Sequence, residues 1–128
     1  MTKILWTSRH EMTAEQKKDL EALLEDEVEV VASENILWAA SADVRADLDA
    51  NIAIWKTLDQ RADHLCGVFP PVAAEALPFA DIKAAIWSPV SAQSKELRAD
   101  GSTQIAFKHL RWAGINAGGR QDGKWRRG

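Results

Sequence analysis

Ser8, Arg9 and His10 stand together near the N-terminus and bring a hydroxyl, a guanidinium and an imidazole to one short segment. Arginine offers a planar fork to a phosphate, and histidine can donate or move a proton near neutral pH. A helix is expected to start just after this segment, and the free N–H groups of a helix start favour an anion. The segment therefore predicts an anion-binding site. The alternative, exposed polar residues at a helix entry, stays open.

A second group of polar residues lies near the C-terminus, at Lys108, His109 and Arg111. In a strand, alternation would place His109 and Arg111 on one face and Lys108 on the other. Three groups that can carry positive charge among aromatic residues could hold a phosphate or stack a base. The alternative is an edge strand that its charges protect from pairing.

The elements that must position these residues follow from hydrophobic periodicity. Thr13 and Gln16 have capping-box spacing, and Val44, Leu48 and Ile52 continue a helical stripe to Trp55. Strands are expected at 3–8, 28–32, 64–69, 84–87 and 103–112, helices at 14–24, from 43 onward and at 71–77, and the last turn within 95–102. This order predicts an α/β fold, a Rossmann-like three-layer sandwich with a mainly parallel sheet and a C-terminal β-hairpin.

Ligands of open parallel sheets bind beyond the carboxyl ends of the strands. The Ser8 segment would lie there, and so would two further polar groups that follow other strands: Ser33 and Asn35 after the second, and Ser88 with Ser91 after the fourth. We therefore expect Ser33, Asn35 and Ser88 to contact the same ligand.

Composition limits the alternatives. The 128 residues suit one domain, expected over 1–113, followed by a basic, flexible tail rich in Gly and Arg over 114–128. The single cysteine excludes an internal disulfide. The sequence also lacks the set of four Cys and His residues that a structural zinc site needs, so neither a metal nor another cofactor is expected. No apolar run is long enough to cross a membrane, and a cytoplasmic protein without membrane contact is expected.

The charge is unevenly distributed. The net charge is -3, but residues 104–128 hold six basic residues and one acidic residue, and the rest of the chain carries -8. A basic end on an acidic domain points to a focused anionic ligand rather than to bulk coating of nucleic acid.

Other residues with chemical potential have structural interpretations. Cys66 lies inside an apolar strand and is expected to be an inert thiol, and His64 is expected to be structural. Trp6, Trp55 and Trp87 are expected in the core. Trp38, Trp112 and Trp125 are less constrained by the pattern and could stack a ligand or a partner.

Residues 9–13 are similar to the Arg-His-Gly-x-Thr opening of the histidine phosphatases, but Glu11 replaces the glycine and no second His-Gly element follows. That family is rejected. The strand ending in Ser8-Arg9-His10, followed by residues 12–16 and a helix, instead resembles the start of small CRISPR-associated proteins with a CARF-like domain. Residues 107–112 are similar to the Phe-Lys-His-x-Arg-aromatic strand that often ends these proteins.

This resemblance implies a ring nuclease that binds, and cleaves without metal, a cyclic oligoadenylate messenger in antiviral defence. The ligand would be a cyclic oligonucleotide or another anionic nucleotide, and a homodimer with two-fold symmetry would present each cluster twice. Ser8, Arg9 and His10 are the expected catalytic residues, and the expected ligand-binding residues are Ser33, Asn35, Ser88, Lys108, His109 and Arg111.

Two alternatives remain open, a non-catalytic α/β interaction module and a domain that only sequesters its ligand. Convergence of Ser8, Arg9 and His10 with the Lys108 strand in one concave site would favour the enzyme. Separation of the two groups would favour the interaction module.

Overall fold

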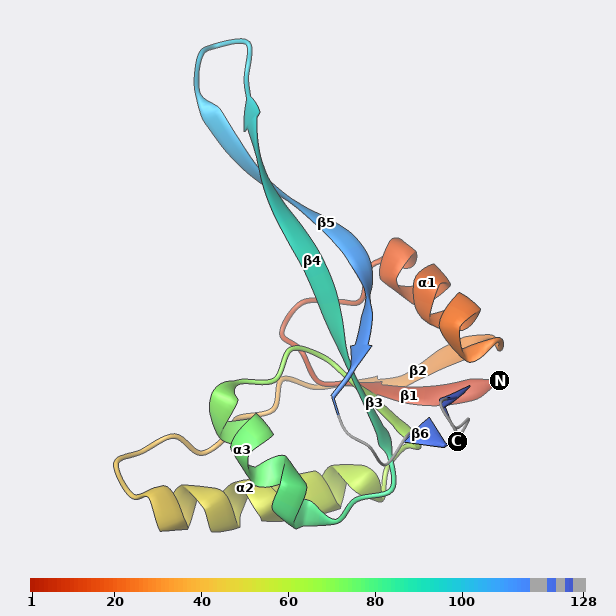
Figure 1. Cartoon of the computed structure of the whole chain (residues 1–128), viewed down its shortest axis with the longest axis vertical. Coiled ribbons are helices and arrows are strands. Elements are labelled where there is room, and N and C mark those ends of the chain that lie inside the picture. Colours follow the sequence, from red (N-terminus) through yellow and green to blue (C-terminus); the bar gives the residue numbers. More distant parts are fainter. Residues whose placement is uncertain (116–119, 122–123, 126–128) are drawn as a thin grey trace.

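The computed structural model describes residues 1–115, 120–121 and 124–125 of the chain. Three helices and a five-stranded sheet make up the body (Figure 1). In chain order the elements are β1 (Thr2–Trp6), α1 (Ala14–Leu24), β2 (Val28–Ser33), α2 (Val44–Asp59), β3 (His64–Cys66), α3 (Pro71–Ala80), β4 (Ala85–Leu97) and β5 (Thr103–Gly114).

The sheet is mostly parallel. Its strand order is β2-β1-β3-β4-β5, with β1 to β4 parallel and β5 antiparallel to β4. After β1 the chain moves outward to β2, and it then returns past β1 to β3. The strand order therefore reverses between β1 and β3, which is where open sheets of this kind leave a crevice at their carboxyl ends.

Helices lie against both faces of the sheet, each over its own apolar cluster (Figure 1). On one face Leu20 and Leu24 of α1 pack on Trp6, Trp87 and Trp112. On the other face, α2 and α3 bury a cluster that contains Leu5, Trp55, Leu58, Leu65, Ala73, Ala76 and Ile86. Alternate residues of each central strand thus serve opposite clusters, as strand geometry requires.

Local sequence signals account for the helix starts. The side chain of Thr13 accepts a hydrogen bond from the Gln16 amide, and the Gln16 side chain accepts one from the Thr13 amide, so the predicted capping box is confirmed. Asp43 caps α2 by accepting from the Ala46 amide. Helix α3 begins at Pro71, where the missing N–H costs nothing, and continues through Pro78 beyond the expected end at 77.

Two strands end more than two residues from their expected bounds. β3 stops at Cys66 rather than at 69, because the chain turns away at Gly67. β4 was expected to end at 87 but runs to Leu97, so Ser88 and Ser91 lie inside a strand and not in a loop after it. The turn occupies only the last part of the expected segment 95–102, between β4 and β5.

The extended β4–β5 hairpin is the most prominent feature of the shape. Trp6, Cys66, Trp87 and Gly114 stand in one row across the sheet, so everything between residues 87 and 114 continues past the carboxyl ends of β1 and β3. We call residues 88–113 the arm. Figure 1 shows the arm rising from the body as a twisted two-stranded ribbon.

The expected flexible tail over 114–128 lies largely outside the described residues. Within it, β6 (Arg120–Gln121) and β7 (Lys124–Trp125) pair with each other in antiparallel fashion. The side chain of Trp125, for which a stacking role was considered, is not among those described. No helix in the described part of the chain has the length and apolar character needed to cross a membrane.

Candidate ligand-binding cleft

A cleft of about 490 Å³ opens at the carboxyl ends of β1, β2 and β3, where the strand order reverses. Ser8, Arg9, His10 and Asn35, four residues expected at the site, line this cleft together. The other lining residues are Thr7, Ile36, Leu37, Trp38, Ala40, Val68, Pro70 and Val72. The volume lies within the range of small-molecule sites in proteins.

The loop after β1 is held by backbone and indole hydrogen bonds. The Thr7 amide donates to the Cys66 carbonyl at 2.8 Å, and the Thr7 hydroxyl donates to the same oxygen at 3.2 Å. The indole Nε1 of Trp6 donates to the His10 carbonyl, which curls the loop back over the strand end. Ser8, Arg9 and His10 therefore stand on a segment that is fixed at both sides.

The loop after β2 is fixed by an ion pair. Arg61 donates both guanidinium N–H groups to Glu34, at 2.7 Å each, and the Glu34 amide donates to the Trp6 carbonyl at 2.8 Å. The hydrogen bonds and charge of Arg61 lower the pKa of the Glu34 carboxyl. Glu34 therefore pairs with Arg61 and does not line the cleft, whereas its neighbour Asn35 does.

The wall of the cleft is aromatic and aliphatic. Trp38 packs against Trp55, with ring centroids 4.7 Å apart, and against Phe69 at 6.3 Å. The rim carries two exposed apolar side chains, Leu37 at 83% and Val68 at 63% exposure. An indole fixed from behind by a second indole is a suitable platform for a planar ring such as a nucleobase.

Gly67 lets the ends of β1 and β3 approach each other under the cleft. A β-carbon at this position would lie 2.5 Å from the Thr7 hydroxyl oxygen and 3.3 Å from the Ser8 amide nitrogen. Any larger residue would push Thr7 and Ser8 out of place. The position of Ser8 in the cleft thus depends on this glycine.

The cleft residues can perform anion recognition. Arg9 and His10 are exposed, and neither forms an ion pair with another described residue. A guanidinium and an imidazole beside a hydroxyl and a carboxamide can bind phosphate oxygens, while Trp38 and Ile36 offer apolar surface to a base. This combination suits a ligand with a charged part and a flat apolar part.

The remaining expected site residues do not line this cleft. Ser33 ends β2 and pairs with Trp6, and Ser88 pairs with Ala113 at the base of the arm. Lys108, His109 and Arg111 lie on the arm, opposite Ala92, Ser91 and Val90. The structure therefore brings together the Ser8 segment and Asn35, and it leaves Ser33, Ser88 and the C-terminal group outside the cleft.

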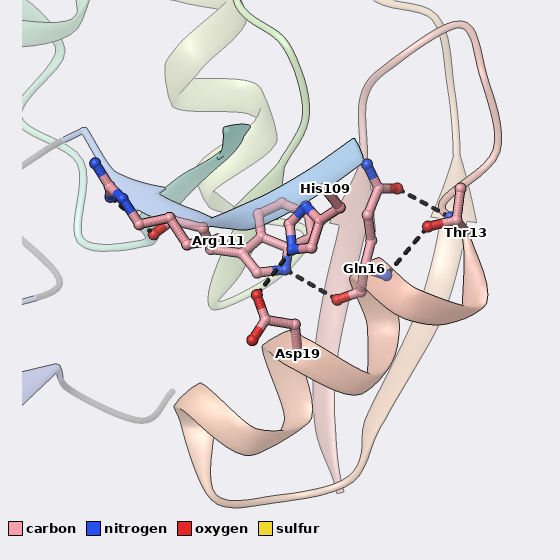
Figure 2. A network of polar contacts seen from close by, with 6 residues as sticks. Thr13, Gln16, Asp19, His109 and Arg111 are labelled. Atoms are coloured by element: carbon pink, nitrogen blue, oxygen red, sulfur yellow. Dashed lines mark hydrogen bonds and ion pairs between the residues drawn. The ribbon is translucent and has the colours of Figure 1, made fainter. Parts of the chain in front are cut away.

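His109 instead belongs to a polar cluster between the arm and α1, shown in Figure 2. Its Nε2 lies 2.8 Å from Oδ2 of Asp19, and the side chain is 6% exposed. The neighbouring Trp112 is buried in the α1 cluster and donates its Nε1–H to the Gln16 carbonyl at 2.9 Å. This packing corrects the expectation that Trp112 is weakly constrained.

A β-bulge explains why the expected alternation is wrong across this segment. Arg111 pairs with Val90 and His109 pairs with Ser91, so Leu110 is an extra residue on β5. The bulge turns His109 and Trp112 toward α1, with ring centroids 5.8 Å apart. Arg111 stands between them in the sequence, and its side chain extends away from Asp19 (Figure 2). Because Arg111 pairs with Val90 and His109 with Ser91, the two side chains lie on opposite faces.

The interpretations of Cys66 and His64 agree with the structure. Cys66 is buried, and burial raises the pKa of its thiol, which makes it a poor nucleophile. His64 is also buried and accepts a hydrogen bond at Nδ1 from the Trp87 indole at 3.0 Å. Among the described residues, no group of three or more His, Cys, Asp or Glu side chains could hold a metal ion.

Several cleft residues could not be recognised from sequence. Thr7, Leu37, Trp38 and Val68 line it, yet they were expected in strands or in connections. Of these, only Trp38 gave a usable signal, as a tryptophan outside every strong apolar pattern.

Comparison of the chain with protein-family models, with curated proteins and with solved structures yields no match in any of the three.

Proposed function

We propose that this protein binds an anionic nucleotide in the cleft at the ends of β1, β2 and β3, and that a cyclic oligoadenylate is its ligand. The observation that carries the proposal is the convergence of Arg9, His10, Ser8 and Asn35 beside the Trp38 wall. Phosphate would pair with Arg9, and the adenine would pack on Trp38. The Rossmann-like three-layer interpretation and the CARF-like resemblance agree with a ligand at this edge of the sheet.

The size of the cleft fits part of such a ring. A volume of about 490 Å³ accommodates a ligand of nucleotide size, whereas a ring of four or six nucleotides is larger. A two-fold homodimer that turns the carboxyl edges of its sheets toward each other would offer two clefts to one symmetric ring. We therefore propose a homodimer as the binding species, acting in the cytoplasm in CRISPR antiviral defence.

Cleavage of the bound ring would follow from the same residues. The ribose 2′-hydroxyl attacks the adjacent phosphorus, a P–O bond to the 5′-oxygen breaks, and a 2′,3′-cyclic phosphate and a 5′-hydroxyl form. His10 would move the proton from the attacking hydroxyl toward the leaving oxygen, and Arg9 would stabilise charge on the phosphorane. Ser8 would orient the phosphate or ribose oxygens.

The experiment uses the full chain and fluorescently labelled cyclic tetra-adenylate. Titration should give saturable binding, and Arg9→Ala should weaken it at least tenfold, because one charge-assisted contact is lost. Arg45→Ala is the matched control, since Arg45 is an exposed arginine of α2 that pairs with Asp49. Absence of saturable binding to both cyclic tetra- and hexa-adenylate would overturn the proposal.

One observation favours the sequestering or non-catalytic alternative over the nuclease. Lys108, His109 and Arg111, expected to complete the active site, lie outside the cleft of their own chain. The full chain is incubated with cyclic tetra-adenylate in the presence of EDTA, and chromatography of the nucleotide then separates these possibilities. Linear products that disappear in His10→Ala, with binding retained, support the nuclease. Binding with an intact ring supports sequestration.

A further inference from the structure

The arm exposes large apolar side chains that its own chain leaves uncovered. Phe107 is 73%, Ile105 51% and Leu97 79% exposed. The pairing register places all three on the face that carries His109 at the base of the arm. A two-stranded ribbon gains little stability from its own contacts in water, so an apolar stripe on it indicates a partner surface.

The arm leaves the body at the same edge as the cleft. Both begin where β1 and β3 end, at Trp6 and Cys66, and the arm continues about ten residues further along β4. At roughly 3.4 Å per residue the arm reaches about 33 Å beyond that edge. Two copies that face each other across this edge would each send an arm along the other's cleft.

Charge favours a second copy as the occupant rather than nucleic acid. Residues 88–113 hold four basic and two acidic residues, whereas residues 1–87 hold eight basic and sixteen acidic residues. An arm of net charge +2 is complementary to a body of net charge -8. A body of that charge disfavours a long nucleic acid along its surface, although Arg9 and His10 offer a local site to a small anion in the cleft. The exposed apolar residues of the arm also have a counterpart in Leu37 and Val68 on the cleft rim.

We propose that the arm of each copy lies across the cleft of a second copy. Phe107 and Ile105 pack on the rim formed by Leu37 and Val68, and Lys95 reaches the anionic ligand in the partner's cleft. Lys95 pairs with Ile105 and therefore shares the face of the apolar stripe. It is exposed and forms no ion pair with any residue in the described part of the chain. The role of Lys95 rests on the proposed function, whereas the docking of the arm does not.

The size of the arm is sufficient for a stable contact. Seventeen residues, 92–108, lie beyond the base that His109 anchors. Stable interfaces use roughly 20–30 residues on each side, so each copy would contribute this segment together with the cleft residues that receive the partner's arm. Two-fold symmetry would create this contact twice.

Chemical cross-linking between two differently tagged full-length variants tests the docking. A Lys95→Cys copy is mixed with an Ala40→Cys copy and treated with a short bis-maleimide. Ala40 is an exposed cleft residue. The wild-type protein serves as the blank, because its single cysteine, Cys66, is buried. Docking of the arm in the partner's cleft predicts that the cross-linked heterodimer is the main product.

Two matched controls make the result specific. Ala22→Cys replaces Ala40→Cys, because Ala22 is also an exposed alanine and lies on α1. Ser94→Cys replaces Lys95→Cys, because Ser94 is its neighbour and points to the opposite face of the arm. Both control pairs should yield several-fold less heterodimer. Equal yields in all pairs, or no heterodimer with Ala40→Cys, would overturn the docking.

Ligand binding then separates this inference from the proposed function. Lys95→Ala should weaken binding of cyclic tetra-adenylate about tenfold, with Lys56→Ala, an exposed lysine of α2, as the control. Cross-linking without any nucleotide binding would overturn the proposed function and leave arm docking supported. Binding that depends on Arg9 but is unaffected by Lys95→Ala would overturn the role of Lys95.

Discussion

His109 on β5 and Asp19 on α1 lie ninety residues apart in the sequence, and a hydrogen bond of 2.8 Å joins Nε2 of the imidazole to Oδ2 of the carboxylate. The imidazole is 6% exposed and the carboxylate 41%. Together with the bond from the Trp112 indole to the Gln16 carbonyl, it fastens the base of the arm to the first helix (Figure 2). The arm thus projects from an anchored base, and its outer part leaves Leu97, Ile105 and Phe107 exposed among the described residues.

Replacing His109 by Ala should lower the free energy of unfolding by about 1–3 kcal/mol, because a buried ring and a hydrogen bond to a charged group are lost. Asp19→Ala should cost less, since the carboxylate is partly solvated. Urea unfolding of both single variants and the double variant gives the coupling energy, expected to be about 0.5–1.5 kcal/mol. Lys108→Ala, an exposed neighbour, should change stability by less than about 0.5 kcal/mol. A coupling energy of zero would contradict this pairing.

The same pair shows where sequence reasoning reached its limit. Periodicity and capping signals located the helices and the parallel strands, because these depend on local spacing such as that of Thr13 and Gln16. They did not give the carboxyl ends of β3 and β4. The β-bulge at Leu110 depends on how β5 fits against β4 and α1, and no local residue signals it. Strict alternation therefore placed His109 beside Arg111 and hid its contact with Asp19.

The cleft was predictable only in part, for a related reason. Ser8, Arg9, His10 and Asn35 could be found because they follow strands, and parallel strands end at one edge. Ser88 failed the same rule, because β4 does not end at 87 but continues into the arm. The length of a hairpin beyond its sheet is set by pairing between distant residues, such as Leu97 with Thr103, and not by local preference.

Gly67→Ala should destabilise the protein and disturb the cleft together. The new β-carbon would lie 2.5 Å from the Thr7 hydroxyl oxygen, and relief of this overlap should cost about 1–3 kcal/mol. Thermal unfolding measures the loss, and the environment of Trp6 and Trp38 can be followed by near-UV circular dichroism. Ser94→Ala is the control, since Ser94 is an exposed residue of β4. The prediction fails if Gly67→Ala unfolds no earlier than Ser94→Ala.

Acid should destabilise the fold through His64. Burial lowers the pKa of this imidazole in the native state, and the charge of Asp63 opposes the shift only in part. Above the unfolded pKa, near 6.5, the imidazole is neutral in both states. As the pH falls below that value the unfolded chain binds more protons than the native one, so stability declines, by up to about 1.4 kcal/mol per pH unit for one group.

The variant His64→Gln tests this assignment, because a glutamine oxygen can still accept the hydrogen bond that Trp87 donates to His64. Urea unfolding between pH 7 and pH 5 should show a shallower decline in stability for the variant than for the wild type. Equal slopes in both proteins would place the acid sensitivity elsewhere. Ser94→Gln provides the control, since Ser94 is exposed and neither serine nor glutamine titrates in this pH range.

Cys66 should resist thiol reagents for as long as the protein stays folded. Cys66 pairs with Trp6 of β1 and Trp87 of β4 in the sheet, and its side chain is completely buried. Burial raises the pKa of the thiol, so the reactive thiolate is scarce. Reaction with a disulfide reagent requires opening of the central sheet, which should slow it roughly 10³-fold or more relative to the protein in urea. A Leu37→Cys variant, with its second thiol on the exposed cleft rim, should react at one site at once and at Cys66 only on unfolding. Rapid labelling of wild-type Cys66 under native conditions would show that the centre of the sheet opens far more readily than its packing implies.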